Sequence, residues 1–308
     1  MFCTARFVVM REKRYLRGKI TMMKTQGKLL LVPAGGLANR MHAIASAYNM
    51  CRRADVAMRV LWFQDWALHA PFHAIFRDSD LIQVREASLV DHVVYDRPRR
   101  RNLCVPRLFQ NLLFDQRIDE EQVTALVEQD FDFVQWARGH NSYMSCFREF
   151  GTFDDAIYSR LFRPVAQVEE QVERLVSQLG TRAIGFHIRR TDNRRSIENS
   201  PLSLFVEAGQ RELAKCPDTK IFLATDDEPT KRQLTEIFGD RLMMQQAEAD
   251  RSSTQGIRGG LVDLYTLART EVVYGSEGSS FSIMAGKIGG KRVVIQNSKF
   301  KIHNLAAR

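Results

Sequence analysis

Short apolar runs alternate with helical patterns through the second half of this chain of 308 residues. The runs that predict strands are Ala183–Ile188, Lys220–Ala224, Glu271–Tyr274 and Arg292–Gln296. The segments that predict helices are Val165–Leu179, a helix with Ser200 as its cap and Pro201 in its first turn, Glu228–Phe238, Val262–Arg269 and Ser280–Ile288. Strands separated by single helices imply a mostly parallel sheet that is covered by helices on both faces.

The first half opens with a similar unit. A strand at Lys28–Pro33 is followed by a glycine turn and by a helix from Ala38 to about Ala54, and Val56–Trp62 is predicted as the next strand. We therefore expect two α/β domains, residues 28–164 and residues 165–308. Residues 1–27 are interpreted as a basic extension or a mis-assigned start, because two methionines directly precede the first strand.

Composition narrows the class of protein. The chain is 44% hydrophobic and 26% charged, which is typical of a soluble globular protein, and its net charge of +9 favours an anionic partner such as nucleic acid, an acidic lipid surface or a phosphorylated small molecule. Five cysteines without C-x-x-C spacing argue against a disulfide framework or a zinc knot and favour a reducing cytoplasm. The pattern of a secretory signal and the long apolar run of a spanning helix are both missing from the sequence.

Four polar loops carry the residues that could bind a ligand. They are 35–40 (Gly-Gly-Leu-Ala-Asn-Arg), 187–192 (His-Ile-Arg-Arg-Thr-Asp), 225–227 (Thr-Asp-Asp) and 275–280 (Gly-Ser-Glu-Gly-Ser-Ser). Open α/β sheets bind ligands at the carboxyl ends of their strands, and a guanidinium matches a phosphate, so Arg189 and Arg190 are interpreted as a phosphate clamp. The alternative is a solvated surface loop.

Two of these loops also have simpler explanations. The glycines and serines of 275–280 can direct backbone amides toward an anion at a helix N-terminus, although an ordinary cap by Ser279 explains them as well. Asp226 and Asp227 can hold a ribose hydroxyl or a metal, or they can cap the next helix.

Taken in this order, the four motifs resemble those of the GDP-fucose-dependent fucosyltransferase superfamily. The likeness is greatest to its α-1,6-fucosyltransferase and bacterial nodulation branch, with kinship to the protein O-fucosyltransferases. It is strongest over residues 183–290, with an anchor at Gly35–Arg40. The resemblance implies a GT-B-like fold of two Rossmann-like domains around an interdomain cleft. It also implies GDP-fucose as the donor, inversion at the anomeric carbon, and no metal or other cofactor.

The resemblance also assigns residues. Arg189 would grip the β-phosphate of the donor and stabilise the charge that develops as GDP departs. The other donor-binding residues that it implies are Arg190 and Asp192 in the same motif, His187 and Asp263 at the guanine, Asp226 and Asp227 as paired acids, Gly278, Ser279 and Ser280 at the diphosphate, and Asn39 facing the sugar.

Direct displacement also needs a base for the acceptor hydroxyl, and Glu198 is the candidate. Members of the α-1,6 branch carry a glutamate shortly after the arginine motif. Here the spacing is one residue longer, and Asn193 stands where those enzymes have a lysine linked to that glutamate. An exposed acid just before the helix entry at 199–201 is an equal alternative.

Two charged tracts favour simpler interpretations. The tract at 97–101 (Arg-Pro-Arg-Arg-Arg) could contact an anionic acceptor, a membrane or nucleic acid, but it lacks the interleaved aromatic residues of a single-strand binder, so a solvated loop is favoured. The tract at 78–80 (Asp-Ser-Asp) is interpreted as a polar turn, although it superficially resembles the metal-binding D-x-D of sugar transferases.

Together these observations predict a cytoplasmic glycosyltransferase that moves L-fucose onto a glycan or a lipid-linked glycan during polysaccharide assembly. Peripheral contact with the anionic inner face of a membrane is a further expectation, and no specific nucleic-acid partner is expected. One alternative is a transferase of the same fold with a different nucleotide sugar. A more distant one is a non-catalytic, nucleic-acid-binding basic protein.

Overall fold

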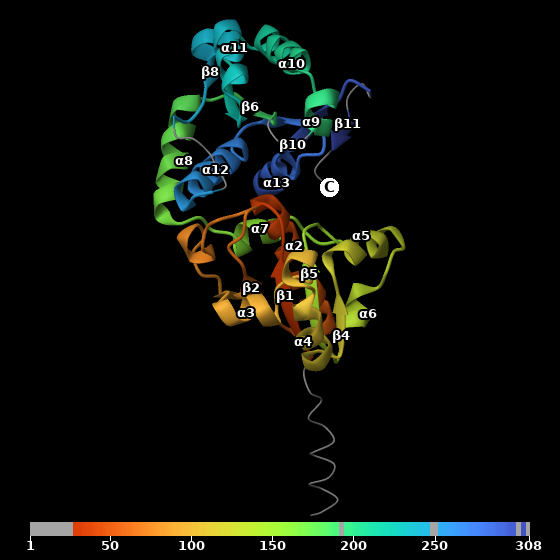
Figure 1. Ribbon diagram of the computed structural model, residues 1–308. Coiled ribbons are helices and arrows are strands. Elements are labelled where there is room, and N and C mark those ends of the chain that lie inside the picture. The colour runs from red at the N-terminus through yellow and green to blue at the C-terminus, as the bar shows by residue number, and fades with distance from the viewer. Residues whose placement is uncertain (1–26, 191–193, 247–251, 300–302, 306–308) are drawn as a thin grey trace, which may run out of the picture.

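The computed structural model describes residues 27–190, 194–246, 252–299 and 303–305. These residues form two α/β domains, which lie one above the other in Figure 1. Each domain is built on its own sheet. Among the described strands every neighbouring pair is parallel except β10 with β11.

The first sheet has the strand order β3-β2-β1-β5-β4. Its strands are β1 (Lys28–Pro33), β2 (Ala57–Trp62), β3 (Gln83–Glu86), β4 (Gln116–Ile118) and β5 (Asn141–Cys146). The helices of this half are α2 (Leu37–Ala54), η1 (Phe72–Ala74), α3 (Leu89–Val94), η2 (Arg100–Asn102), α4 (Val105–Leu113), α5 (Glu120–Glu128), α6 (Phe133–Ala137) and α7 (Ala156–Leu161). Helix α2 is buried along most of its length because it packs on β1, on α6 and α7, and on α13 of the second domain.

The second sheet has the order β11-β10-β9-β6-β7-β8. Its strands are β6 (Ala183–Ile188), β7 (Lys220–Thr225), β8 (Leu242–Met243), β9 (Val272–Ser276), β10 (Arg292–Gln296) and β11 (His303–Leu305). The helices are α8 (Ala166–Leu179), α9 (Arg194–Asn199), α10 (Leu202–Lys215), α11 (Glu228–Phe238), η3 (Gly239–Arg241), α12 (Thr254–Leu267) and α13 (Ser280–Gly289). Strand β6 is buried throughout, as a parallel strand covered on both faces must be.

The expected α/β class is confirmed, with differences at individual elements. Helix α12 begins at Thr254, eight residues before the predicted start at Val262, because glycines within its first two turns interrupt the helical sequence pattern. Helix α10 begins at Leu202 with Pro201 at its N-cap, so Ser200 is not the cap. The Ser200 hydroxyl instead donates to the Gln296 carbonyl oxygen at 2.5 Å.

The change from one sheet to the other falls between Cys146 and Ala183, and the expected domain boundary near Pro164 lies within this interval. No helix among the described residues is both long enough and apolar enough to cross a bilayer.

Candidate functional site

A cavity of about 780 Å³ lies between the two domains and is lined by residues of both. In each sheet the chain reverses its direction of winding at one strand. Strand β1 has β2 on one side and β5 on the other, and β6 has β7 on one side and β9 on the other. Such reversals open a crevice at the carboxyl ends of the strands. The cavity is lined by the segments that follow β1, β5, β6 and β9, so it lies at both reversals at once.

The loop after β1 is held in place by the buried guanidinium of Arg40. Its Nε donates to the Gly35 carbonyl oxygen at 2.8 Å, Nη1 donates to the Phe63 carbonyl oxygen, and Nη2 forms an ion pair with Asp65 at 2.9 Å. Burial lowers the pKa of Arg40 to about 10, which still leaves it charged at neutral pH. A charge that is buried and fully bonded fixes the backbone around it, so the glycine loop is rigidly placed.

Gly35 itself is required by this geometry. Its φ of +78° lies in the left-handed region, and a Cβ there would stand 3.0 Å from the Asn39 side-chain nitrogen. Asn39 lies on the cavity wall. The tight turn at Gly35 therefore directs the first turn of α2 toward the cavity.

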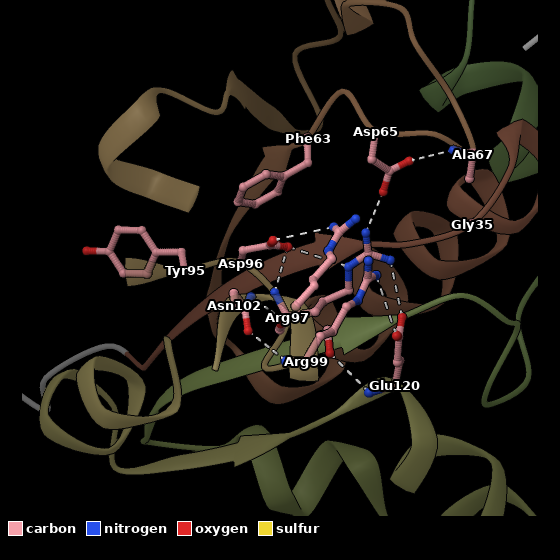
Figure 2. Close-up of polar contacts among 12 residues, drawn as sticks. Gly35, Phe63, Asp65, Ala67, Tyr95, Asp96, Arg97, Arg99, Asn102 and Glu120 are labelled. Carbon is pink, nitrogen blue, oxygen red and sulfur yellow. Dashed lines mark hydrogen bonds and ion pairs between the residues drawn. The ribbon is translucent and has the colours of Figure 1, made fainter. Parts of the chain in front are cut away.

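Arg97 departs most from the predicted solvated loop at 97–101. It is 5% exposed and forms ion pairs with Asp65, with Glu120 at 3.3 Å and with Asp96 at 3.8 Å (Figure 2). The prediction is wrong at this position because buried carboxylates need a cation beside them, and Arg97 supplies it. Arg101, farther along the tract, is exposed.

The two arginines that follow β6, Arg189 and Arg190, point to different parts of the molecule. Arg189 lines the cavity, and its backbone N–H donates to the Ser276 hydroxyl at 3.2 Å. The Arg190 guanidinium instead donates to the carbonyl oxygens of Ile197 and Ser200, at 3.2 and 2.9 Å, and so supports the end of α9. One guanidinium of the expected pair therefore lies on the cavity wall, and Asp192 lies outside the described residues.

Of the two acids that follow β7, only Asp226 lies at the cavity. Asp226 lies on the cavity wall, and its Oδ1 accepts from the Arg190 backbone N–H at 3.0 Å. Asp227 is the N-cap of α11 and accepts from both the backbone N–H and the hydroxyl of Thr230, at 2.9 and 2.6 Å. The capping interpretation therefore describes Asp227, which is not among the residues that line the cavity.

The segment after β9 brings a helix N-terminus to the cavity. Gly278, Ser279 and Ser280 all line it, and Gly278 has a φ of +70°. The Ser279 hydroxyl makes no cap hydrogen bond and lies 3.3 Å from His187 Nδ1 instead. The ordinary serine cap is therefore absent from this helix start, and the N-terminal end of α13, which favours an anion, borders the cavity.

His187 lies beneath this segment. Its ring stacks on Phe281, with centroids 4.7 Å apart and planes at 28°. Burial, together with the charge of Arg189, lowers the pKa of His187 to about 4. The imidazole is thus neutral near pH 7 and can both donate and accept a hydrogen bond.

Asp263, on α12, is a buried carboxylate on the cavity wall. It is 7% exposed, and burial raises its pKa to about 7. In the described part of the chain, its Oδ1 and the Thr225 hydroxyl are two buried polar atoms of the cavity wall with no hydrogen-bond partner. Buried polar groups are normally bonded, so each of these atoms points to a polar ligand.

Glu198 lies on the exposed side of α9, where its Oε1 accepts from Arg194 at 2.6 Å. It is not among the residues that line the cavity. The local ion pair follows from the spacing of four residues on one helix, and it gives Glu198 the exposed position that the alternative interpretation expected.

A different carboxylate, Glu149, lines the cavity from the segment after β5. His42 Nδ1 lies 3.0 Å from its Oε2, the Tyr158 hydroxyl donates to it at 3.0 Å, and Lys287 of the second domain lies 3.0 Å away. Burial disfavours the charged form, but the hydrogen bonds and charges of His42 and Lys287 outweigh it and lower the pKa of Glu149 to about 2.

Sequence reasoning missed this cluster of three residues, His42, Glu149 and Lys287. The only local signal was that His42 follows Asn39 by three positions, which places both on one face of α2. Nowhere in the described ranges do three or more His, Cys, Asp or Glu side chains gather as candidate ligands of a metal ion.

Comparison with known proteins identifies the fold. No protein-family model and no curated protein matches the sequence. Among solved structures, the NodZ α-1,6-fucosyltransferase soaked with GDP-fucose, an enzyme whose structure is also described from Bradyrhizobium, aligns with a TM-score of 0.62. The alignment has 16% identity and covers 92% of this chain and 100% of that one.

Two further structures align over most of the chain. A mutant of Arabidopsis thaliana FUT1 in complex with GDP has a TM-score of 0.55 and 14% identity, over 88% of this chain and 70% of that one. POFUT1 in complex with GDP-fucose has a TM-score of 0.54 and 10% identity, over 86% and 95%. The predicted two-domain, GT-B-like fold is thereby confirmed.

Proposed function

We propose that this protein transfers L-fucose from GDP-fucose to a hydroxyl group of a glycan or a lipid-linked glycan, with inversion and without a metal ion. The observation that carries the proposal is the cavity that lies at both sheet reversals. There Arg189, the N-terminus of α13 and the unpaired Oδ1 of Asp263 meet Asn39 of the other domain. The similar solved structures contain GDP-fucose or GDP, which supports the same donor here.

Asp263 is the proposed guanine-binding residue. Guanine presents two adjacent N–H donors on one edge, and these match the two oxygens of a carboxylate. Because the Asp263 site is buried, a base without such donors would leave the unpaired Oδ1 of Asp263 unsatisfied. The neutral His187 nearby adds a donor or an acceptor for the nucleoside.

Arg189 and the start of α13 are proposed to hold the diphosphate. A guanidinium and the N-terminal end of a helix stabilise negative charge as the bond from the anomeric carbon to the phosphate oxygen breaks. Neither group has to reorganise during the reaction. This provides a route to leaving-group stabilisation from protein groups alone.

The acceptor hydroxyl must lose its proton as its oxygen bonds to the anomeric carbon. His42 is positioned for this step better than the sequence-based candidate Glu198, because His42 lines the cavity. When Nδ1 of His42 donates to Glu149 at 3.0 Å, Nε2 keeps its lone pair and can take the proton. Glu149 is held ionised by Lys287, and it would stabilise the imidazolium that forms.

The donor half is tested by calorimetric titration of GDP-fucose, GDP-mannose and UDP-glucose in the presence of EDTA. We expect saturable binding of the GDP sugars, weaker binding to Arg189→Ala, and unchanged binding to Arg194→Ala, whose side chain is 90% exposed on α9. If UDP-glucose binds more tightly than the GDP sugars, the donor is not a GDP sugar. A folded protein that binds none of the three would refute the site.

The transfer half is tested with a panel of glycan acceptors and NMR of the product's anomeric configuration. A β-linked donor that yields an α-linked product establishes inversion. Activity that EDTA abolishes and a divalent cation restores would overturn the metal-free mechanism. If Glu198→Gln loses turnover and His42→Gln does not, Glu198 rather than His42 is the general base.

A further inference from the structure

Apolar side chains gather on one exposed face of helices α3 and α4 in the first domain. These two helices pack against each other. The face, which we call the α3–α4 face, consists of Leu89, Val90, Val93, Leu103, Leu108, Phe109, Leu112 and Leu113, all of them exposed. They are eight of the eleven exposed large hydrophobic residues within the described ranges. Such a contiguous patch marks an interaction site more often than chance exposure does.

The orientation of α4 is fixed with its apolar side outward. Its buried residues are Pro106 and Gln110. The Gln110 side-chain amide donates to the Asp96 carbonyl oxygen at 2.9 Å and accepts from Arg117 at 3.2 Å. Leu108 and Leu112, on the opposite side, are 65% and 83% exposed. Rotating the helix to bury the leucines would break the Gln110 network, so the exposed face is built into the domain.

Basic side chains border the α3–α4 face. Arg101 on η2 and Arg107 on α4 have side chains that are 54% exposed, and Arg100 is exposed beside them. The acids nearest to Arg101 and Arg107 are Asp96 and Asp119, whose side chains are only 8% and 17% exposed. The accessible border of the patch thus carries the three arginines and the exposed acid Asp115, which leaves it net positive.

We propose that the α3–α4 face is a docking surface for an anionic lipid bilayer, with the leucines in the interface and the arginines at the headgroups. An apolar face with a cationic border is the pattern of interfacial helices. A second copy of the chain fits less well, because two-fold pairing would bring the arginine borders of both copies together. Figure 1 places α4 at the end of the first domain remote from the second domain, so docking there leaves the interdomain cavity accessible.

The experiment is flotation of the full chain with vesicles of phosphatidylcholine alone or with phosphatidylglycerol added, at low and high salt. We expect binding to the anionic vesicles that weakens about fivefold for each of Arg100 and Arg101 changed to Gln, in line with the contribution of one basic residue at such a surface. The double variant Leu108→Asp/Leu112→Asp should lose binding by at least about tenfold, because two carboxylates replace inserted apolar groups.

The matched control is Ile237→Asp, an isolated exposed apolar residue on α11 of the second domain, which should leave vesicle binding unchanged. GDP-fucose titration of each variant reports folding and the donor site separately from lipid binding. The proposal is overturned if the full chain ignores anionic vesicles, or if the α4 double variant still binds them. It is also overturned if wild type is a dimer in solution that the double variant dissociates, since a second copy then covers the face.

Discussion

Replacing Asp263 by Asn is expected to stabilise the unliganded protein while weakening its binding of a GDP sugar. Burial raises the pKa of Asp263 from 3.8 to about 7, so the folded protein holds this proton more tightly than the unfolded chain does. The free energy of unfolding therefore falls as pH rises from about 4 to 7, and it stays low above that range. Asn keeps the shape of the side chain without the charge.

The size of the effect follows from the two pKa values. An acid with a pKa of 3.8 unfolded and about 7 folded costs roughly 4 kcal/mol of stability at pH 8 and between about 1 and 2 kcal/mol at pH 5. The stability difference between Asp263→Asn and wild type should therefore grow by about 2 to 3 kcal/mol between pH 5 and pH 8. GDP-fucose should bind the wild type about tenfold more weakly at pH 6 than at pH 8, because only the ionised carboxylate accepts from guanine.

Urea denaturation of both proteins at the two pH values measures the first effect, and calorimetric titration with GDP-fucose measures the second. GDP-fucose suits the titration because its diphosphate diester does not change charge in this range. If the stability difference is the same at pH 5 and pH 8, the Asp263 carboxylate does not destabilise the folded protein. If the variant binds GDP-fucose as tightly as wild type does, Asp263 does not bind the donor.

Four further substitutions test the rest of the site. Arg189→Lys should lower kcat by a factor on the order of 10²–10³, since a point charge replaces a preorganised fork, and steady-state kinetics beside Arg194→Lys as an unchanged control would measure it. His42→Gln should lower kcat by about 10²–10⁴ at unchanged GDP-fucose affinity, and equal losses in kcat and affinity would show that it only supports the fold. Gly35→Ala should lower the melting temperature and the turnover together, because a φ of +78° strains any residue with a Cβ, and a normal melt would contradict this. Glu149→Gln should lower the free energy of unfolding at pH 7. Because the pKa of Glu149 is lowered to about 2, this loss of stability should shrink as pH falls below about 4.5. Denaturation curves that show the same loss at every pH would exclude the ion pair as its cause.

The accuracy of the sequence-based fold prediction depended on how apolar each strand is in sequence. Strands β1, β6 and β10 coincide with their predicted bounds because each contains a run of apolar residues. Strand β5 is central and buried, but its sequence is largely polar, and it was not predicted. Strands β3 and β4 gave no comparable signal, since they lie at the edges of the first sheet and are four and three residues long with polar side chains. The local sequence pattern identifies a strand that is an apolar run, and it fails where the strand is short or polar.

The sequence indicated some residues of the candidate site and missed others. The sequence by itself indicated Arg189, Asp226 and the start of α13 as candidate site residues, because they follow strands whose ends share one sheet edge. Asn39 was expected at the site from the family resemblance. The strand-end argument could not distinguish Arg189 from Arg190, to which only the family resemblance gave different roles, since adjacent residues turn toward different neighbours once the chain leaves the strand.

Only the tertiary structure brought His42, Glu149 and Lys287 together. They come from α2, from the segment after β5 and from α13, far apart along the chain, and no sequence spacing records such contacts. Their charges also depend on packing, because burial and the nearest partner set each pKa. The strand order of each sheet decided where the cavity lies, and the docking of α13 on α2 decided which side chains meet across it.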